Sequence, residues 1–161
     1  MRRALPICLA LLIAGCSAGH ELATFQAASS EKALVRWQRK GKSLVYDGVF
    51  ARAQDGSVVV RLYKQSPAPL VEFRLGRDNI FSAGGRLAGR GWTGPATDAP
   101  SVFSAWIWFL TAYQRSAATQ PDASSLQSAT MRVSSTMSGD KLKVLSVSNT
   151  ETGEVVSAIM N

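Results

Sequence analysis

The chain has 161 residues, and 46% of them are hydrophobic. This length suits one domain that buries a core of its own, so a second domain is not needed. With 18 Lys and Arg against 11 Asp and Glu, the formal net charge is +7, which favours anionic lipid head groups or acidic partners. One histidine and two cysteines leave few residues for metal binding or nucleophilic catalysis.

The start of the chain has the layout of a secretory signal. Arg2 and Arg3 give a basic start, residues 4–14 are mostly apolar, and small residues then lead into Cys16. A membrane-spanning helix needs about 20 apolar residues, so this run is too short to cross a bilayer. The pattern therefore predicts export of the chain and not a membrane span.

The end of this signal resembles the bacterial lipobox, in which an aliphatic residue, two small residues and a cysteine follow one another, here as Ile13, Ala14, Gly15 and Cys16. The resemblance implies that residues 1–15 are removed as a signal peptide, that Cys16 is lipidated, and that residues 16–28 form a tether. Ser17 stands where aspartate marks inner-membrane retention in many Gram-negative bacteria, so similarity to that sorting rule favours the outer membrane, facing the periplasm. The alternative is an ordinary signal, cleaved after Ala18, in which Cys16 is incidental.

The remaining chemistry argues against an enzyme. Cys8 leaves with the signal, Cys16 is acylated, and His20 lies in the tether, so the body of the protein has no thiol or imidazole for catalysis. The glycines of the stretch 84–94 have the spacing of a dinucleotide-binding motif, but no helical pattern follows them, so we expect no nucleotide site there. We expect no metal and no cofactor. Export and the lack of a long basic run in the sequence also exclude nucleic acid as a partner.

A short N-terminal helix is predicted for residues 29–41. Two serines at its start offer an N-cap, Leu34 and Trp37 share a helical face, and basic residues precede Gly41. These are helix start and stop signals in the correct order, so residues 29–161 are expected to begin with this helix.

Seven stretches rich in β-branched and aromatic residues, separated by turn signals, predict strands. They span residues 44–53, 57–64, 70–75, 80–81, 129–137, 141–148 and 154–160. Two tight turns join the last three stretches and predict an antiparallel meander. The fold class that follows is α+β, with a single antiparallel sheet of about seven strands.

The strongest helical pattern comes after Pro100. Apolar residues recur there at spacings of four, three and four, and further apolar residues widen the stripe. The set is Val102, Phe103, Trp106, Ile107, Phe109, Leu110 and Tyr113. Such a helix should cover one face of the sheet. Its aromatic side chains either fill a core or also wall an apolar ligand cavity.

The lipobox, the short helix, the antiparallel sheet and the aromatic covering helix together resemble the LolA/LolB lipoprotein-carrier group. The resemblance implies a half-barrel, a strongly curved sheet closed on its concave side by helices, whose cavity binds acyl chains. A protein of this kind carries or inserts lipidated cargo at the outer membrane without covalent chemistry. The candidate cavity residues are Val71, Phe73, Phe103, Trp106, Phe109 and Leu110.

The alternative function is a tethered accessory lipoprotein that binds another envelope protein and has a filled core. It would use a sheet edge or anionic contacts made by Arg74, Arg77, Arg86 and Arg90. The shape of the interior separates the two hypotheses. A hollow of several hundred Å³ favours lipid binding, whereas a filled interior favours the accessory role.

Overall fold

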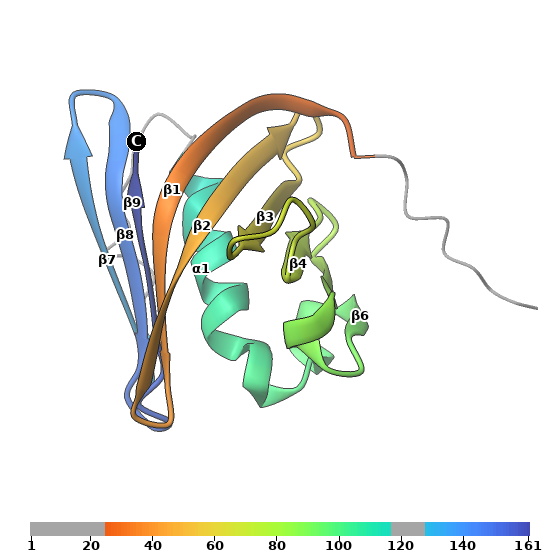
Figure 1. Ribbon diagram of the computed structural model, residues 1–161, viewed down its shortest axis with the longest axis vertical. Helices are drawn as coiled ribbons and strands as arrows, with labels where there is room; N and C mark the ends of the chain where they lie inside the picture. Colours follow the sequence, from red (N-terminus) through yellow and green to blue (C-terminus); the bar gives the residue numbers. More distant parts are fainter. Residues whose placement is uncertain (1–24, 117–127) are drawn as a thin grey trace, which may run out of the picture.

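A computed structural model describes residues 25–116 and 128–161, which form one antiparallel sheet with a helix on one face (Figure 1). The predicted signal peptide, the lipidation site and most of the tether lie outside the described residues. The strands are β1 (Ala27–Arg39), β2 (Lys42–Ala53), β3 (Val58–Tyr63), β4 (Val71–Leu75), β5 (Ile80–Gly84), β6 (Trp92–Pro95), β7 (Met131–Ser138), β8 (Lys141–Asn149) and β9 (Val155–Met160). The helix α1 spans Ser104–Arg115, and three single-turn 3-10 helices are η1 (Arg86–Ala88), η2 (Ala96–Asp98) and η3 (Ser101–Phe103).

The first strand, β1, replaces the predicted short helix over residues 29–41, so that prediction was wrong. Its side chains alternate between buried and exposed, with Ala33 and Val35 buried on one face and the residues between them exposed. Lys40 and Gly41 both have left-handed backbones, with φ angles of 49° and 73°. Two such residues make the tight turn of a β-hairpin, so the glycine that suggested a helix end in fact turns β1 into β2.

The sheet has nine strands in the described part of the chain, in the order β6-β5-β4-β3-β2-β1-β9-β8-β7. All seven predicted strands are present, and the two additional ones are β1 and β6. The strand β6 is only four residues long and lies at the end of the glycine-rich stretch, so its alternation is too short to recognise. The three-stranded meander β7-β8-β9 is confirmed, as is the α+β class.

The sheet does not form the predicted strongly curved half-barrel. It is open, because its edge strands β6 and β7 stand at opposite ends of the strand order and do not pair with each other. It is neither closed nor strongly curled. The long strand β1 lies in the middle and pairs with β2 on one side and β9 on the other, which joins the first six strands to the last three.

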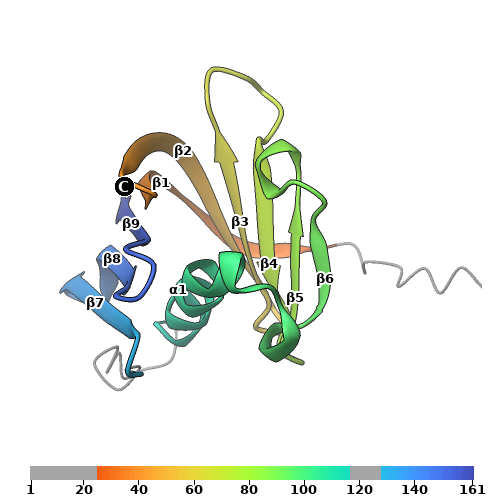
Figure 2. The ribbon, with the colours of Figure 1, turned by 90° about the horizontal axis from the view of Figure 1, so that it is seen from below.

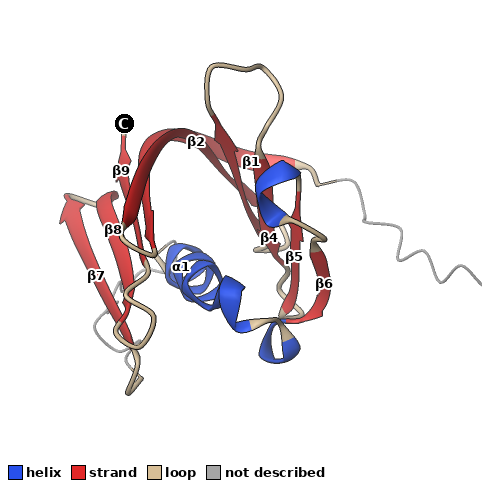
Figure 3. Ribbon diagram, turned by 60° about the horizontal axis from the view of Figure 1, so that its bottom comes forward, coloured by secondary structure: helices blue, strands red, loops and turns tan. Residues whose placement is uncertain are grey.

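The helix α1 covers what we call the inner face of the sheet. In sequence it follows β6 and precedes β7, the two edge strands, and it therefore crosses the face between them. It contacts β3 and β4 from one half of the sheet and β7, β8 and β9 from the other (Figures 2 and 3). Within the described residues, no helix is long and apolar enough to span a bilayer.

Candidate functional site

The six candidate cavity residues lie together between the sheet and the helix. Two come from the inner face of β4, one from the end of η3 and three from α1; they are Val71, Phe73, Phe103, Trp106, Phe109 and Leu110. Phe103 is 7% exposed and the other five are 0% exposed. The sequence therefore identified residues that meet in space, and it identified them because the helical stripe and the alternation of β4 both mark one buried face.

These side chains pack against one another. The rings of Phe73 and Trp106 are stacked, with their centroids 4.4 Å apart and an interplanar angle of 23°. Phe109 lies 5.7 Å from Trp106, and Phe103 lies 6.3 Å from Phe73. Separations of this size are those of aromatic rings in direct contact, so the position predicted for acyl chains is occupied by the protein's own side chains.

Three further aromatic residues under α1 were not predicted as part of this cluster: Trp37, Tyr46 and Phe50. Trp37 lies edge-on to Trp106, with centroids 5.4 Å apart, and Phe50 lies 5.8 Å from Phe109. Trp37 was missed because residues 29–41 were predicted to be helical, which hid the inner face of β1; Tyr46 and Phe50 lie on the predicted strand 44–53, whose buried face was not assigned to the cluster. The alternation of Ala33, Val35 and Trp37 was the signal that could have found it.

The indole nitrogen of Trp106 is an exception in this packed core. It is buried and has no hydrogen-bond partner among the described residues, and the same is true of Trp92. A buried donor without a partner costs about 1–3 kcal/mol. The apolar contacts of the core must therefore offset the free-energy cost of these two buried N–H groups.

A cluster of polar residues, which we call the polar clamp, fixes the C-terminal end of α1 to the sheet. The hydroxyl of Tyr113 donates a 2.6 Å hydrogen bond to Oε1 of Glu31 on β1. The guanidinium of Arg52 on β2 stacks 3.7 Å above the Tyr113 ring and donates to Gln114 O and to Oγ of Ser116. Burial, followed by the hydrogen bond to Glu31, raises the pKa of Tyr113, so the phenol stays a donor at neutral pH.

A second buried polar contact lies where β1 meets the turn before β9. The indole nitrogen of Trp37 donates a 2.7 Å hydrogen bond to Oε1 of Glu154, and Glu154 is only 3% exposed. Burial raises the pKa of this carboxyl group, and the bond from Trp37 and the charge of Arg39 oppose that rise. The contact ties the turn before β9 to β1.

The four arginines predicted for anionic contacts are not brought together. Arg74 lies on the outer face of β4, with its guanidinium 5.4 Å from the centroid of the Phe25 ring. Arg77 is exposed in the turn after β4, whereas Arg86 and Arg90 are exposed in the connection between β5 and β6, at the other end of β5. They form separate positive positions, and a single anion-binding site does not follow from them.

An open pocket of about 290 Å³ lies where β1 begins and the β2-β3 hairpin turns. Its lining is half apolar and half polar in residue type: Phe25, Gln26, Ala27, Ala28, Ala53, Gln54, Asp55 and Arg74. None of the six candidate cavity residues lines it. Asp55 accepts a hydrogen bond from the backbone of Ser57, which lowers the pKa of its carboxyl group and gives it a role in the hairpin turn.

Cys16 and His20 lie outside the described residues, and so does any site that they form. Within residues 25–116 and 128–161, no group of three or more His, Cys, Asp or Glu side chains is placed to hold a metal ion. A comparison of the sequence with known proteins found no matching family model and no significantly similar curated protein.

Proposed function

We propose that this protein is a lipid-anchored accessory protein of the bacterial envelope, which binds another protein through its surface and keeps a filled core. The observation that supports this role is the stacking of Trp106 on Phe73 at 4.4 Å beneath α1. Acyl chains need an apolar hollow of several hundred Å³. The packed rings leave the interior with a structural role, so the binding function is assigned to the surface.

The strand β7 is the surface that we propose for the partner. It lies at an edge of the sheet, and β8 is its only neighbour among the described strands. It runs for eight residues without proline, and its first six residues pair with β8 in regular register before the shift after Thr136. Native edge strands are usually short, charged or interrupted, because unpaired backbone groups attract a further strand. The opposite edge fits that rule, since β6 has four residues and ends at Pro95. An extended segment of a partner would add to β7 through main-chain hydrogen bonds.

The direction of the backbone groups of β7 gives a sharp test. The carbonyl of Thr130 accepts a bond from Thr150 on the β8 side, and backbone groups alternate in direction along a strand. Ser135, five residues later, therefore directs its N–H to the free edge. The substitution Ser135→Pro removes that donor and leaves the bonds to β8 in place.

We expect crosslinking and affinity purification of the native lipoprotein from its own envelope to recover one specific partner, which Ser135→Pro loses. The matched control is Ser135→Ala, which removes the hydroxyl group but keeps the N–H, and it should retain the partner. A partner recovered equally with both variants would contradict the role of β7. No specific partner with the wild-type protein would contradict the accessory function itself.

The predicted anchor has its own test, which does not depend on a partner. Mass spectrometry of the mature protein should find a chain that begins at a diacylated Cys16, and membrane fractionation should place it in the outer membrane. A mature chain with a free thiol at Cys16, or one that begins after Ala18, would remove the anchor from the proposal. The edge strand would then act in a protein released into the periplasm.

Binding of acyl chains or lipidated cargo is the second candidate function. Its favouring observation is that α1 covers much of the aromatic cluster, while the buried nitrogen of Trp106 has no hydrogen-bond partner among the described residues. Movement of α1 would expose the six candidate residues. A fluorescent fatty acid whose emission shifts with the wild-type protein, but not with a folded Trp106→Arg variant, would favour this function over the accessory role.

A further inference from the structure

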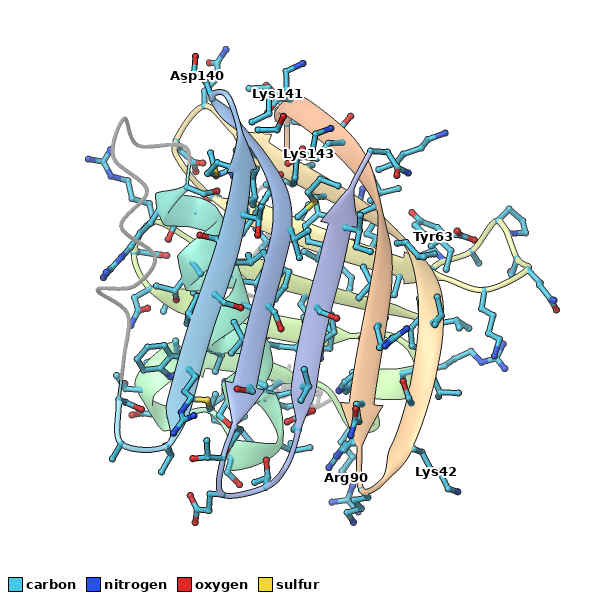
Figure 4. All side chains as sticks on the ribbon, turned by 90° about the vertical axis from the view of Figure 1, so that its left-hand side faces the viewer. Lys42, Tyr63, Arg90, Asp140, Lys141 and Lys143 are labelled. Atoms are coloured by element: carbon cyan, nitrogen blue, oxygen red, sulfur yellow. The ribbon has the colours of Figure 1, made fainter. Side chains whose placement is uncertain are left out.

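The face of the sheet opposite α1, which we call the outer face, is not covered by any described helix or strand over β7, β8, β9, β1 and the first part of β2; its side chains are buried only farther along, at Ala51 and Val59. Figure 4 shows β7, β8, β9, β1 and β2 side by side with this face toward the viewer, and α1 lies behind them. A sheet face open to water is ordinary when its side chains are polar. Much of this face fits that rule, since Ser134, Ser146 and Ser157 stand in one row across β7, β8 and β9.

An apolar stripe crosses the same face beside the serine row. Val144 of β8 is paired with Ile159 of β9, and Ile159 is paired with Leu34 of β1. Ile159 is 53% exposed and Leu34 is 47% exposed, and Val45 on β2 is 44% exposed close to them. These are three of the most exposed large apolar side chains in the described residues, and cross-strand pairing places them together.

Three positive charges lie beside this stripe. Lys32 and Arg36 flank Leu34 on the same side of β1, and Lys143 is exposed next to Val144. None of the three makes a salt bridge within the part of the chain that the structure describes. On the neighbouring part of the face, by contrast, Arg61 is paired with Glu72. Asp47, opposite Leu34, is the one acidic side chain on the outer face of these five strands, among the described residues.

We propose that this outer patch, made of Leu34, Val45, Val144 and Ile159 with Lys32, Arg36 and Lys143 beside them, docks on an anionic phospholipid surface. Each Lys or Arg close to an anionic leaflet contributes about 1 kcal/mol, and shallow contact of apolar side chains adds to it. The ten residues between Cys16 and Ala27 reach at most roughly 35 Å when fully extended. An anchored chain would therefore keep this face within reach of the bilayer.

The composition of the outer patch favours a lipid surface over a protein partner. The cores of protein interfaces are enriched in aromatic residues and depleted in charges, and stable ones bury roughly 800 Å² on each side. The stripe here is aliphatic and only four residues in size, and beside it lie three cations that form no ion pair with another described residue. That combination fits a fluid anionic surface, which adapts its shape to the protein. The proposal concerns the outer face and is separate from partner binding at the edge of β7.

The test measures how close the outer face lies to a bilayer. The mature full-length protein carries a single introduced cysteine that is labelled with an environment-sensitive fluorophore. It is placed in vesicles in which one lipid has a quencher on its head group, and quenching of the fluorophore is measured. Thr136→Cys places the label in the same row as the stripe, opposite Val144, and Ser101→Cys places it on the side of α1. Labelling of the wild-type protein measures the background from Cys16.

We expect at least twofold stronger quenching at position 136 than at position 101 in vesicles containing phosphatidylglycerol. The difference should vanish in pure phosphatidylcholine and at about 1 M salt, where the screening length falls to about 3 Å. Equal quenching at both positions, or quenching that ignores lipid charge and salt, would overturn the proposal. Either result would leave the recovery of a partner through β7 unaffected.

Neutral substitutions measure the electrostatic part directly. Lys32→Gln and Lys143→Gln should each lower the ratio of docked to undocked protein about fivefold, the equivalent of 1 kcal/mol for each cation near an anionic leaflet. Arg77→Gln removes the same charge from an exposed turn outside the patch and should change the ratio little. Circular dichroism confirms that each variant is folded. A loss with Arg77→Gln equal to that with Lys32→Gln would show that net charge acts without a docking face, which would contradict the proposal.

Discussion

The two faces of the sheet place neighbouring residues of one strand in opposite environments. On β1, Val35 is 0% exposed against α1, whereas Leu34 beside it is 47% exposed. On β9, Ala158 is 0% exposed and Ile159 is 53% exposed. Apolar residues on the inner face are explained by the core that they fill. Leu34 and Ile159 on the outer face contribute little to the core, which is why we propose a contact outside the molecule for them.

The comparison extends to the small residues of the last three strands. Ser134, Ser146 and Ser157 form a row on the outer face, while Leu145 and Val147 face α1 and are buried. The serines therefore do not widen a cavity beneath the helix. Their small side chains lie beside the apolar stripe on the outer face. Changes on the inner face should alter the stability of the protein, and changes on the outer face should alter its binding.

The largest effect is expected from the inner face. Replacing Trp106 by Ala removes a fully buried ring that stacks on Phe73, and the free energy of unfolding should fall by about 3–5 kcal/mol. Urea denaturation followed by circular dichroism measures the loss. The matched control is Trp108→Ala on the same helix, whose ring is only partly buried and whose loss should be clearly smaller. Similar losses for both variants would contradict the central place of Trp106 in the core.

The polar clamp offers a second test of the inner face, because it holds the end of α1 to the sheet by three hydrogen bonds and one stacking contact. Tyr113→Phe removes the 2.6 Å bond to Glu31 and keeps the ring beneath Arg52. We expect the free energy of unfolding to fall by about 1.5–3 kcal/mol, the usual contribution of a hydrogen bond to a charged group. Thermal denaturation should show the loss. Tyr46→Phe, a tyrosine without a described hydrogen bond from its hydroxyl group, is the control and should differ little from wild type.

Much of the fold was predictable because its signals are local. The seven stretches of β-formers and the aromatic stripe of α1 each depend on spacing within about ten residues. The error over residues 29–41 arose because Leu34 and Trp37 fit a helical spacing, and Gly41 fits a helix end as well as a hairpin turn. Pairing with both β2 and β9 decides the outcome, and that pairing is a long-range property.

The sequence predicted which residues lie together beneath α1, but it did not predict whether they enclose a cavity or form a filled core. The helical stripe and the alternation of Val71 and Phe73 identify the residues that meet beneath α1. Whether they enclose a space or fill it depends on distances of a few ångströms between distant segments, such as that between Phe73 and Trp106. The outer patch could not be recognised either, because it requires the register of Leu34 with Ile159. The lipidation of Cys16 stays a prediction.

An intermediate effect is expected from the buried carboxyl group of Glu154. Since burial raises the pKa of Glu154, its carboxyl group binds a proton more tightly in the folded protein than in the unfolded chain. The contribution of Glu154 to the free energy of unfolding is therefore fully present below the ordinary glutamate pKa, and it is lost as the pH rises through the higher pKa of the folded state. In Glu154→Gln, unfolding free energies measured across this interval should decline less with pH. An identical pH dependence in wild type and variant would show that Glu154 does not contribute.

The smallest effect on stability is expected from a substitution on the outer face. This substitution tests most directly whether the inner and outer faces of the sheet have different roles. Leu34→Ser replaces a side chain that is 47% exposed, so the free energy of unfolding should change by no more than about 0.5 kcal/mol. The same substitution shortens the apolar stripe and should weaken docking on phosphatidylglycerol vesicles. The inner-face change Val35→Ser on the same strand is the matched control and should destabilise the fold. If Leu34→Ser destabilised it as much, Leu34 would be a structural residue, and its exposure would need no partner to explain it.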